Sequence, residues 1–182
     1  MEGEFVAKYS ANRVSDYLRS GGRASSTTAQ GRACEDLGDY LFSKFSGVDL
    51  VARDQLDAFG AMETDLVFTN NAVRSGLYFL EPVLIVECKN YSSTRVSSED
   101  VAYFASRLSS KGARSGVILT TTTVSGAQGY AGIRAMEVAL AQGTTVLLID
   151  GAHLNSLDST ESLLATLMNQ MVHFRTHGTL LR

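Results

Sequence analysis

The stretch Val83–Tyr91, read as VLIVECKNY, decides how the rest of the chain can be arranged. Its first four residues are apolar and predict a buried strand. Glu87 and Lys89 follow two positions apart, and residues i and i+2 of a strand face the same way. A carboxylate and an ammonium group therefore share one face at the end of an apolar strand. Charges in such a place need a partner of opposite charge, a metal ion or a chemical role.

A second strand-like segment lies upstream, at Glu63–Phe68 (ETDLVF), and its central charge is Asp65. By composition alone, the chain would contain about 0.4 acid-x-Lys tripeptides. It contains one, at Glu87 and Lys89, and that one ends the most strand-like run of the sequence. A charged, solvated strand end is the alternative, but the neighbouring strand with Asp65 favours a chemical site.

The composition limits the class of protein. A length of 182 residues suits one domain with a large core. The two cysteines, Cys34 and Cys88, form neither a metal-ligand spacing nor a disulfide framework, which is typical of a reducing compartment. The acidic start MEGEF lacks the apolar core of a signal peptide, and no apolar run is long enough to span a bilayer. We therefore expect a cytoplasmic protein without membrane contact.

The charge argues against a protein that coats nucleic acid, because the formal net charge is −3. An acidic pocket that holds cations can still act on phosphodiesters. Arginine outnumbers lysine 12 to 4, and arginine suits phosphate contacts. A solvated helix face is the alternative for each arginine near the start of the chain. These arginines are Arg13, Arg19, Arg23 and Arg32.

Two helices are predicted before the strands. Residues Phe5–Ser20 have a helical pattern, and Gly21-Gly22 would end this accessory helix. Hydroxyl caps at Ser25–Thr28 would begin a longer helix that runs to about Phe45. Glu35 lies on that second helix, where it is either a solvated acid or part of the site.

Alternating and apolar runs then predict an antiparallel meander, with the catalytic candidates on its second and third strands. Turn residues separate the runs, and the only proline interrupts the third strand. The predicted segments are the strand Asp49–Leu56, a turn at Ala58–Ala61, the strand Glu63–Phe68, a turn at Asn70-Asn71, and the strand Gly76–Val86 with Pro82.

Beyond Tyr91 helices and strands alternate, which predicts parallel strand pairing with right-handed crossovers. The predicted segments are a helix that begins at Ser97–Asp100 and ends at Lys111-Gly112, the strand Ser115–Thr120, the helix Gly126–Gln142 and the strand Thr145–Ile149. The fold class is therefore α/β, with a mixed central sheet and helices on both faces.

A last helix is predicted at Ala152–Gly178. Its apolar stripe is either core or a subunit contact. His173 and His177 have the i, i+4 spacing that could bind a metal, but no acidic residue lies in that turn, so we expect no metal there. We expect one domain over residues 1–182. It would consist of an accessory helix (1–24), a core (25–154) and a C-terminal helix (155–182).

The acids and the lysine together resemble the PD-(D/E)XK nuclease superfamily, whose signature is an acid, a variable spacing and then acid-x-Lys. The runs VECKNYSS, GVILTTT and VLLIDG look like the catalytic domain of Mrr-type restriction endonucleases, so the resemblance covers about Thr27–Leu154. The proline that names the superfamily is absent before Asp65, where Thr64 stands. The resemblance implies a restriction endonuclease-like αβββαβ(αβ) core.

Phosphodiester hydrolysis explains these residue types, because it needs a hard divalent cation with oxygen ligands and a group that orients water. Asp65, Glu87 and the Cys88 carbonyl would supply the oxygens. Lys89 would lie beside the attacking water, and Glu35 is a further candidate that would hold a second cation or its waters. Mg²⁺ is the expected cofactor, and Mn²⁺ would substitute for it. Asn90 and Tyr91 are candidates for substrate contact.

We therefore expect a metal-dependent DNA endonuclease of the restriction or defence type. Two alternatives use the same fold: a structure-specific nuclease for junctions, flaps or single strands, and a non-catalytic module that binds nucleic acid or protein. DNA is the expected partner. A homodimer is expected because cutting both strands generally requires two sites, and recognition would reside in a separate subunit or in DNA shape or modification.

Overall fold

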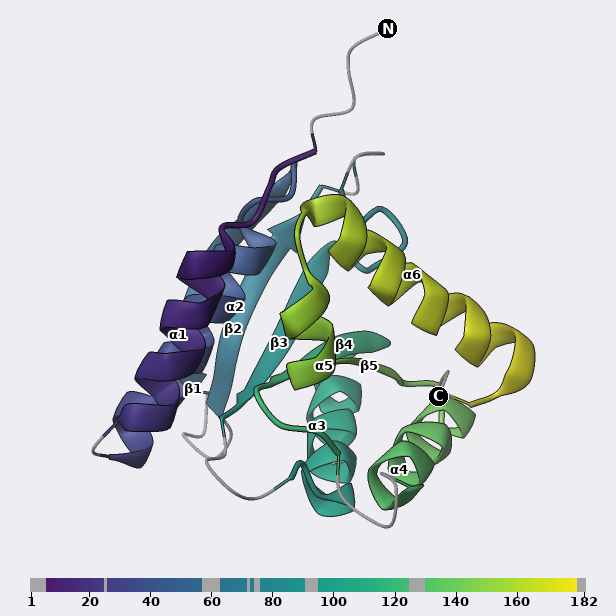
Figure 1. Cartoon of the computed structure of the whole chain (residues 1–182). Coiled ribbons are helices and arrows are strands. Elements are labelled where there is room, and N and C mark those ends of the chain that lie inside the picture. The colour runs from purple at the N-terminus through teal and green to yellow at the C-terminus, as the bar shows by residue number, and fades with distance from the viewer. Residues whose placement is uncertain are drawn as a thin grey trace, which may run out of the picture.

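The computed structural model has a five-stranded mixed sheet between helices, as the sequence predicts (Figure 1). The structure describes residues 6–24, 26–56, 63–71, 73, 76–90, 95–124 and 130–179. The elements, in chain order, are α1 (Ala11–Arg23), α2 (Thr27–Phe42), β1 (Val48–Leu56), β2 (Glu63–Asn70), β3 (Val83–Lys89), α3 (Ser98–Ser110), β4 (Ser115–Thr120), α4 (Tyr130–Ala141), β5 (Thr145–Ile149), α5 (Gly151–Ser156) and α6 (Thr160–His177).

The sheet has the order β1-β2-β3-β4-β5. β1, β2 and β3 pair antiparallel, whereas β3, β4 and β5 pair parallel. The predicted antiparallel meander and the predicted parallel pairing of the later strands are therefore both confirmed. β3 joins the two halves, and the residues of β4 and β5 are buried throughout, as expected for parallel strands covered on both faces.

Glycines bring the helices close to both faces of the sheet. A Cβ at Gly38 of α2 would overlap Leu66 and crowd Leu119, whereas a Cβ at Gly116 of β4 would overlap Leu108 of α3. Gly116 and Leu119 are three residues apart in one strand, so they face opposite ways. α2 therefore covers one face of the sheet and α3 covers the other.

α6 closes the free edge of β5. The Gln170 side chain accepts a hydrogen bond from the Leu148 backbone N–H and donates one to the Leu148 carbonyl, at 2.9 and 2.7 Å. It thus satisfies backbone groups that a sixth strand would otherwise pair with. The apolar stripe of this helix is core, because Leu163, Leu167 and Phe174 are buried.

The predicted end of the first helix at Gly21-Gly22 is wrong, because α1 continues through both glycines to Arg23. Gly21 is buried, and a Cβ there would overlap the side-chain amide of Asn90, directly after β3. That amide donates to the Gln30 carbonyl at 2.7 Å and accepts from the Thr121 hydroxyl at 2.7 Å. The glycine is therefore a packing residue that lets α1 approach the end of β3.

The predicted third strand begins too early. The structure has turns at residues 76–80, and β3 starts at Val83. The Asn70 side-chain amide lies within hydrogen-bond distance of the carbonyls of Leu77, Leu80 and Glu81, and the Asn70 N–H donates to the Pro82 carbonyl. These bonds hold the segment as a compact loop and leave only the residues after the proline to form the strand.

The predicted last helix is interrupted. α5 ends at Ser156, and α6 begins after its N-cap Ser159, whose side chain accepts from the Ser162 N–H. The Thr160 N–H donates to the Ala7 carbonyl at 2.9 Å. The break thus provides a docking place for the N-terminal segment. Other predicted segments extend beyond the described residues: Phe5, the turn Ala58–Ala61 and the first turn of the helix from Gly126.

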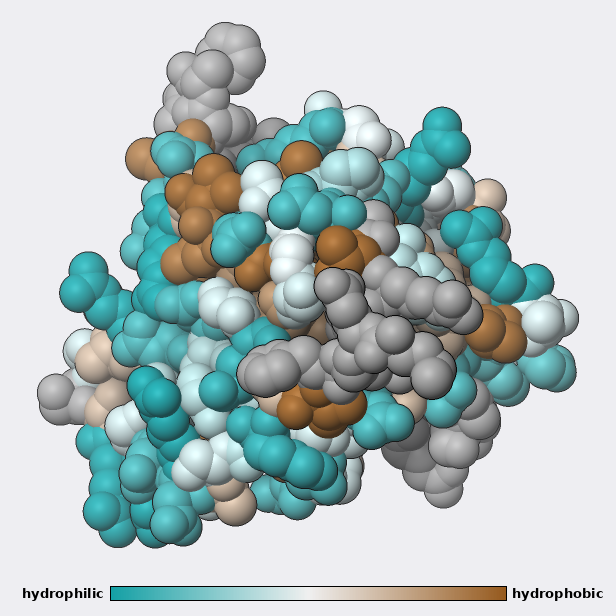
Figure 2. All heavy atoms as spheres, turned by 90° about the horizontal axis from the view of Figure 1, so that it is seen from above, coloured by the Kyte–Doolittle hydropathy of each residue, from teal (hydrophilic) through white to brown (hydrophobic). Residues whose placement is uncertain are grey.

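Seen from above, the surface is mainly hydrophilic, and its hydrophobic residues form separate areas (Figure 2). Among the described residues, no helix has both the length and the apolar composition needed to cross a bilayer.

We predict opposite effects for two adjacent substitutions in α1. Gly21→Ala should lower the free energy of unfolding by about 1–3 kcal/mol, because the new Cβ displaces Asn90 from two hydrogen bonds. Gly22→Ala should raise it by roughly 0.5–1 kcal/mol, because a Cβ at Gly22 meets nothing within 4 Å and alanine favours a helix. Urea unfolding of both variants measures the difference. Equal stabilities would show that Asn90 does not constrain α1.

Candidate active site

β2 and β3 part at the site. Their paired register ends at Leu66 opposite Val86. Beyond that pair, the Cys88 backbone N–H donates to the Asp65 carboxylate at 2.6 Å rather than to a backbone carbonyl. Asp65 thus lies where the two strands diverge, and the diverging strands leave room for side chains between them.

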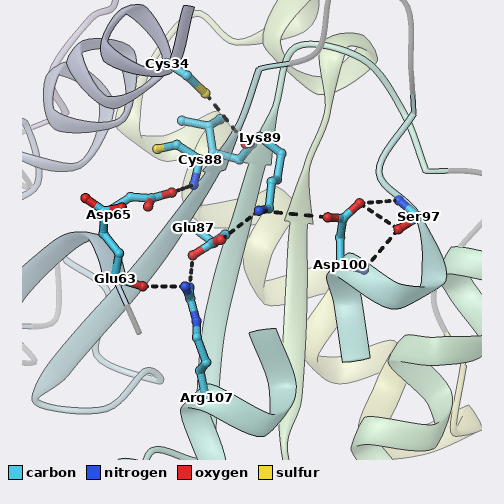
Figure 3. A network of polar contacts seen from close by, with 10 residues as sticks. Cys34, Glu63, Asp65, Glu87, Cys88, Lys89, Ser97, Asp100 and Arg107 are labelled. Carbon is cyan, nitrogen blue, oxygen red and sulfur yellow. Dashed lines mark hydrogen bonds and ion pairs between the residues drawn. The ribbon is translucent and has the colours of Figure 1, made fainter. Parts of the chain in front are cut away.

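Glu87 is held between two cations in this gap (Figure 3). It is only 3% exposed. Its Oε1 lies 3.0 Å from Lys89 Nζ, and its Oε2 accepts a hydrogen bond from Arg107 Nη2. A carboxylate buried this deeply is stable as an ion only with such partners. Glu87 and Lys89 therefore lie side by side on one face of β3, as the sequence predicts.

Arg107 reaches the gap from α3. Its Nη1 donates to the Glu63 carbonyl, so the guanidinium group bridges β2 and β3. Its charged centre lies 5.4 Å from the ring centre of Tyr103 and 5.7 Å from that of Phe104. Arg107 is 6% exposed, and its buried Nε has no hydrogen-bond partner among the residues that the structure describes. Burial lowers the pKa of Arg107, and Asp65 and Glu63 oppose that change.

Lys89 has a second acidic neighbour, Asp100, at the start of α3. Asp100 Oδ1 lies 3.9 Å from Lys89 Nζ, and Oδ2 accepts from the backbone and hydroxyl of Ser97. This capping box fixes the Asp100 side chain. Lys89 is therefore positioned from both sides by carboxylates, while it keeps partial access to solvent.

Glu35 approaches the same region from α2. It is 8% exposed, and its pKa is raised to about 7, first by burial and then by the nearby charges of Asp54 and Asp65. Burial also raises the pKa of Asp65, against the effects of the Cys88 N–H, Lys89 and Arg107. On the α2 side of the gap, acids thus lie close together with too little positive charge to balance them.

A family model described as restriction endonuclease, that of the Mrr catalytic domain, matches residues 42–157. This range covers more than half of the chain. The chain belongs to the Mrr-type restriction endonuclease family. A comparison with curated proteins gave no significant match. The matched range contains Asp65, Glu87, Lys89 and Arg107, whereas α1 and Glu35 precede it.

The Mrr-type fold brings most of the predicted site residues together. Asp65, Glu87, Cys88 and Lys89 lie where β2 and β3 part. Glu35 lies on α2, near enough to Asp65 for the charge of Asp65 to raise its pKa. Asn90 ties α1 and α2 to the strand end, and its contact with substrate stays a prediction. Tyr91 lies outside the described residues. In α6 the rings of His173 and His177 stack on each other, with their centres 4.3 Å apart.

Three further residues of the site were not predicted: Asp54, Asp100 in its contact with Lys89, and Arg107. Asp54 has a positive φ of 48° near the end of β1. Asp100 and Arg107 are seven positions apart on α3, so they lie on one helix face with about 10.5 Å between them. Asp100 is opposite in charge to Lys89, and Arg107 is opposite in charge to Glu87. That complementarity was visible in the sequence, but only together with the placement of α3.

The oxygen atoms of Asp65, Glu87 and Glu35 are the ligand type that hard divalent cations prefer. Within the ranges that the structure describes, however, no three His, Cys, Asp or Glu side chains converge on a common metal position. The reason is visible in the orientation of Glu87, which is turned toward Arg107 and Lys89 (Figure 3). The donor chemistry therefore suits a cation, but Glu87 is already neutralised by the protein.

We predict that Glu35 makes folding stability decrease with pH in metal-free buffer. Its pKa is raised from 4.5 to about 7, so between these values the folded protein keeps a proton that the unfolded chain has lost. Glu35→Gln should therefore gain stability relative to wild type as the pH rises through this window, with no further gain above it. Urea unfolding in EDTA across the window measures this.

The exposed acid Glu161 of α6 provides the control. Glu161→Gln also removes one acid, outside the site, and its unfolding over the same pH range is the reference against which the effect of Glu35→Gln is judged. A Glu35→Gln variant that follows the wild-type curve in parallel would contradict the raised pKa of Glu35.

Proposed function

We propose that this Mrr-type domain is a divalent-metal-dependent endonuclease that hydrolyses DNA phosphodiester bonds in restriction or defence. The observation that carries the proposal is the meeting of Asp65, Glu87 and Lys89 where β2 and β3 part. An acid on one strand and an acid with a lysine on the next form a set suited to phosphoryl chemistry.

Each residue of this set has a role in the proposal. Asp65, Glu87 and the Cys88 carbonyl would hold Mg²⁺, which Mn²⁺ could replace. The bound cation would polarise the phosphate and lower the pKa of a water molecule. Lys89 would orient that water and stabilise negative charge, since two carboxylates fix its ammonium group. Glu35, with its raised pKa, is the candidate for a second cation or its waters.

We predict that Lys89→Ala reduces DNA cleavage by roughly 10²-fold or more, because the charge beside the scissile phosphate is lost. Wild type should cut plasmid DNA with Mg²⁺ or Mn²⁺ and should be inactive in EDTA. Gel analysis of plasmid, modified, linear and branched substrates measures the rates and separates a restriction enzyme from a structure-specific nuclease.

Lys44→Ala is the matched control, because Lys44 lies over the Tyr40 ring rather than at the strand ends. It should cut like wild type. If Lys89→Ala folds and cuts as fast as Lys44→Ala, the proposed active site is wrong. If wild type binds DNA but never cuts it with either metal, the chain is a binding module.

We also propose that the whole chain is one domain that works as a homodimer on DNA. Contacts between its two ends support a single domain, since the Ala7 N–H donates to the Thr160 hydroxyl at 3.1 Å. Light scattering should give twice the chain mass, and dilution below the dimer dissociation constant should favour nicked over linear plasmid. A monomer that linearises plasmid in a single binding event would contradict the dimer.

A further inference from the structure

We propose that Arg107 is an internal counter-cation that competes with a divalent metal ion for Glu87. In this role Arg107 is a positioning residue that acts through Glu87, and the inference rests on the proposed metal-dependent function. Both oxygens of Glu87 are in use: one lies near Lys89, and the other accepts from Arg107. A metal ion that takes Glu87 as a ligand must therefore share or replace one of these cations.

The charges of the gap favour replacement of Arg107. The carboxylates of Asp65, Glu87 and Asp100 face the cations of Lys89 and Arg107, so the group carries a net charge close to −1 without any metal. A divalent ion beside Arg107 would add two positive charges next to a third in a buried place, where screening is weak. Removal of the guanidinium group from Glu87 restores the balance.

Arg107 donates to the Glu63 carbonyl as well as to Glu87, yet it is held less completely than its burial suggests. Its Nε is buried without a hydrogen-bond partner in the described part of the chain, which is unfavourable for a charged group. Tyr103, one helical turn earlier, is 49% exposed and already lies beside the guanidinium group. An arginine that leaves Glu87 would therefore keep an aromatic face and gain water for its unpaired nitrogen. Lys89, in contrast, keeps the Asp100 carboxylate beside it when Glu87 turns away.

The competition has a chemical consequence for Glu87. Without metal, Arg107 and Lys89 hold the Glu87 carboxylate turned away from Asp65, so the two acids do not face each other across the gap. With metal, the same carboxylate would turn to the cation shared with Asp65. The free energy of metal binding then depends on the difference between the metal–Glu87 and the Arg107–Glu87 interactions. The metal ion therefore binds more weakly than it would if Glu87 had no cation beside it.

Isothermal titration of the DNA-free protein with Mn²⁺ tests this competition. Arg107→Met keeps the length and apolar packing of the side chain but removes its charge, so it should bind Mn²⁺ roughly tenfold more tightly than wild type. Arg107→Lys, which keeps the charge, should remain close to wild type. Arg134→Met is the control, because Arg134 pairs with Glu137 on the exposed side of α4, and it should bind Mn²⁺ like wild type.

Melting curves separate competition from a structural role. In EDTA, Arg107→Met should melt at a lower temperature than wild type, because Glu87 has lost a partner. Saturating Mn²⁺ should reduce that difference, since tighter binding adds more stability. If Arg107 has only a structural role, the difference stays the same with Mn²⁺ and the Mn²⁺ affinity is unchanged or weaker, which would overturn the competition.

A measurement on wild type covers the case in which Arg107→Met does not fold. The Nε–H signal of Arg107, assigned by its loss in Arg107→Lys, should shift in step with Mg²⁺ saturation in NMR spectra. A signal that stays fixed while Mg²⁺ binds would overturn the competition and leave the proposed nuclease intact. If neither wild type nor variants bind Mn²⁺ and wild type does not cut DNA, the metal site itself fails, and the competition fails with it.

Discussion

The hydrogen bond from the Cys88 N–H to the Asp65 carboxylate is the contact on which the site depends. Two paired strands cannot separate without leaving backbone groups unpaired, and a buried unpaired group costs about 1–3 kcal/mol. Here Asp65 accepts from the free N–H of β3, and Arg107 donates to the free Glu63 carbonyl of β2. The same charged side chains that form the site thus also compensate for the gap that contains it.

The helices around the gap each fix one side of it. The capping box at the start of α3 holds Asp100 toward Lys89, and two turns later Arg107 meets Glu87. On the other side, Asn90 ties the strand end to α1 and α2. α1 lies outside the matched family range, so this chain supplies part of the support for its strand end from its own N-terminal addition.

The sequence predicts the sheet well because its strands are apolar runs with clear ends, as at Ser115–Thr120 and Thr145–Ile149, which match β4 and β5. It fails where one side chain overrides local preference: Asn70 folds a predicted strand into a loop, and Gly21 serves packing rather than helix termination. The partnership of Arg107 with Glu87 was beyond reach, because it depends on how a crossover places one helix against another strand.

The charge of the site is unevenly distributed, and this asymmetry follows from the fold. On the α3 side, Glu87 has two cations and is fully neutralised. On the α2 side, burial raises the pKa of both Glu35 and Asp65, and the charges of Asp54 and Asp65 raise that of Glu35 further. Positive charge is therefore lacking on the α2 side, whereas Glu87 is already neutralised by its partners. A cation drawn by the field of these acids would approach between Glu35 and Asp65 first, and Glu87 would be the last ligand it could recruit.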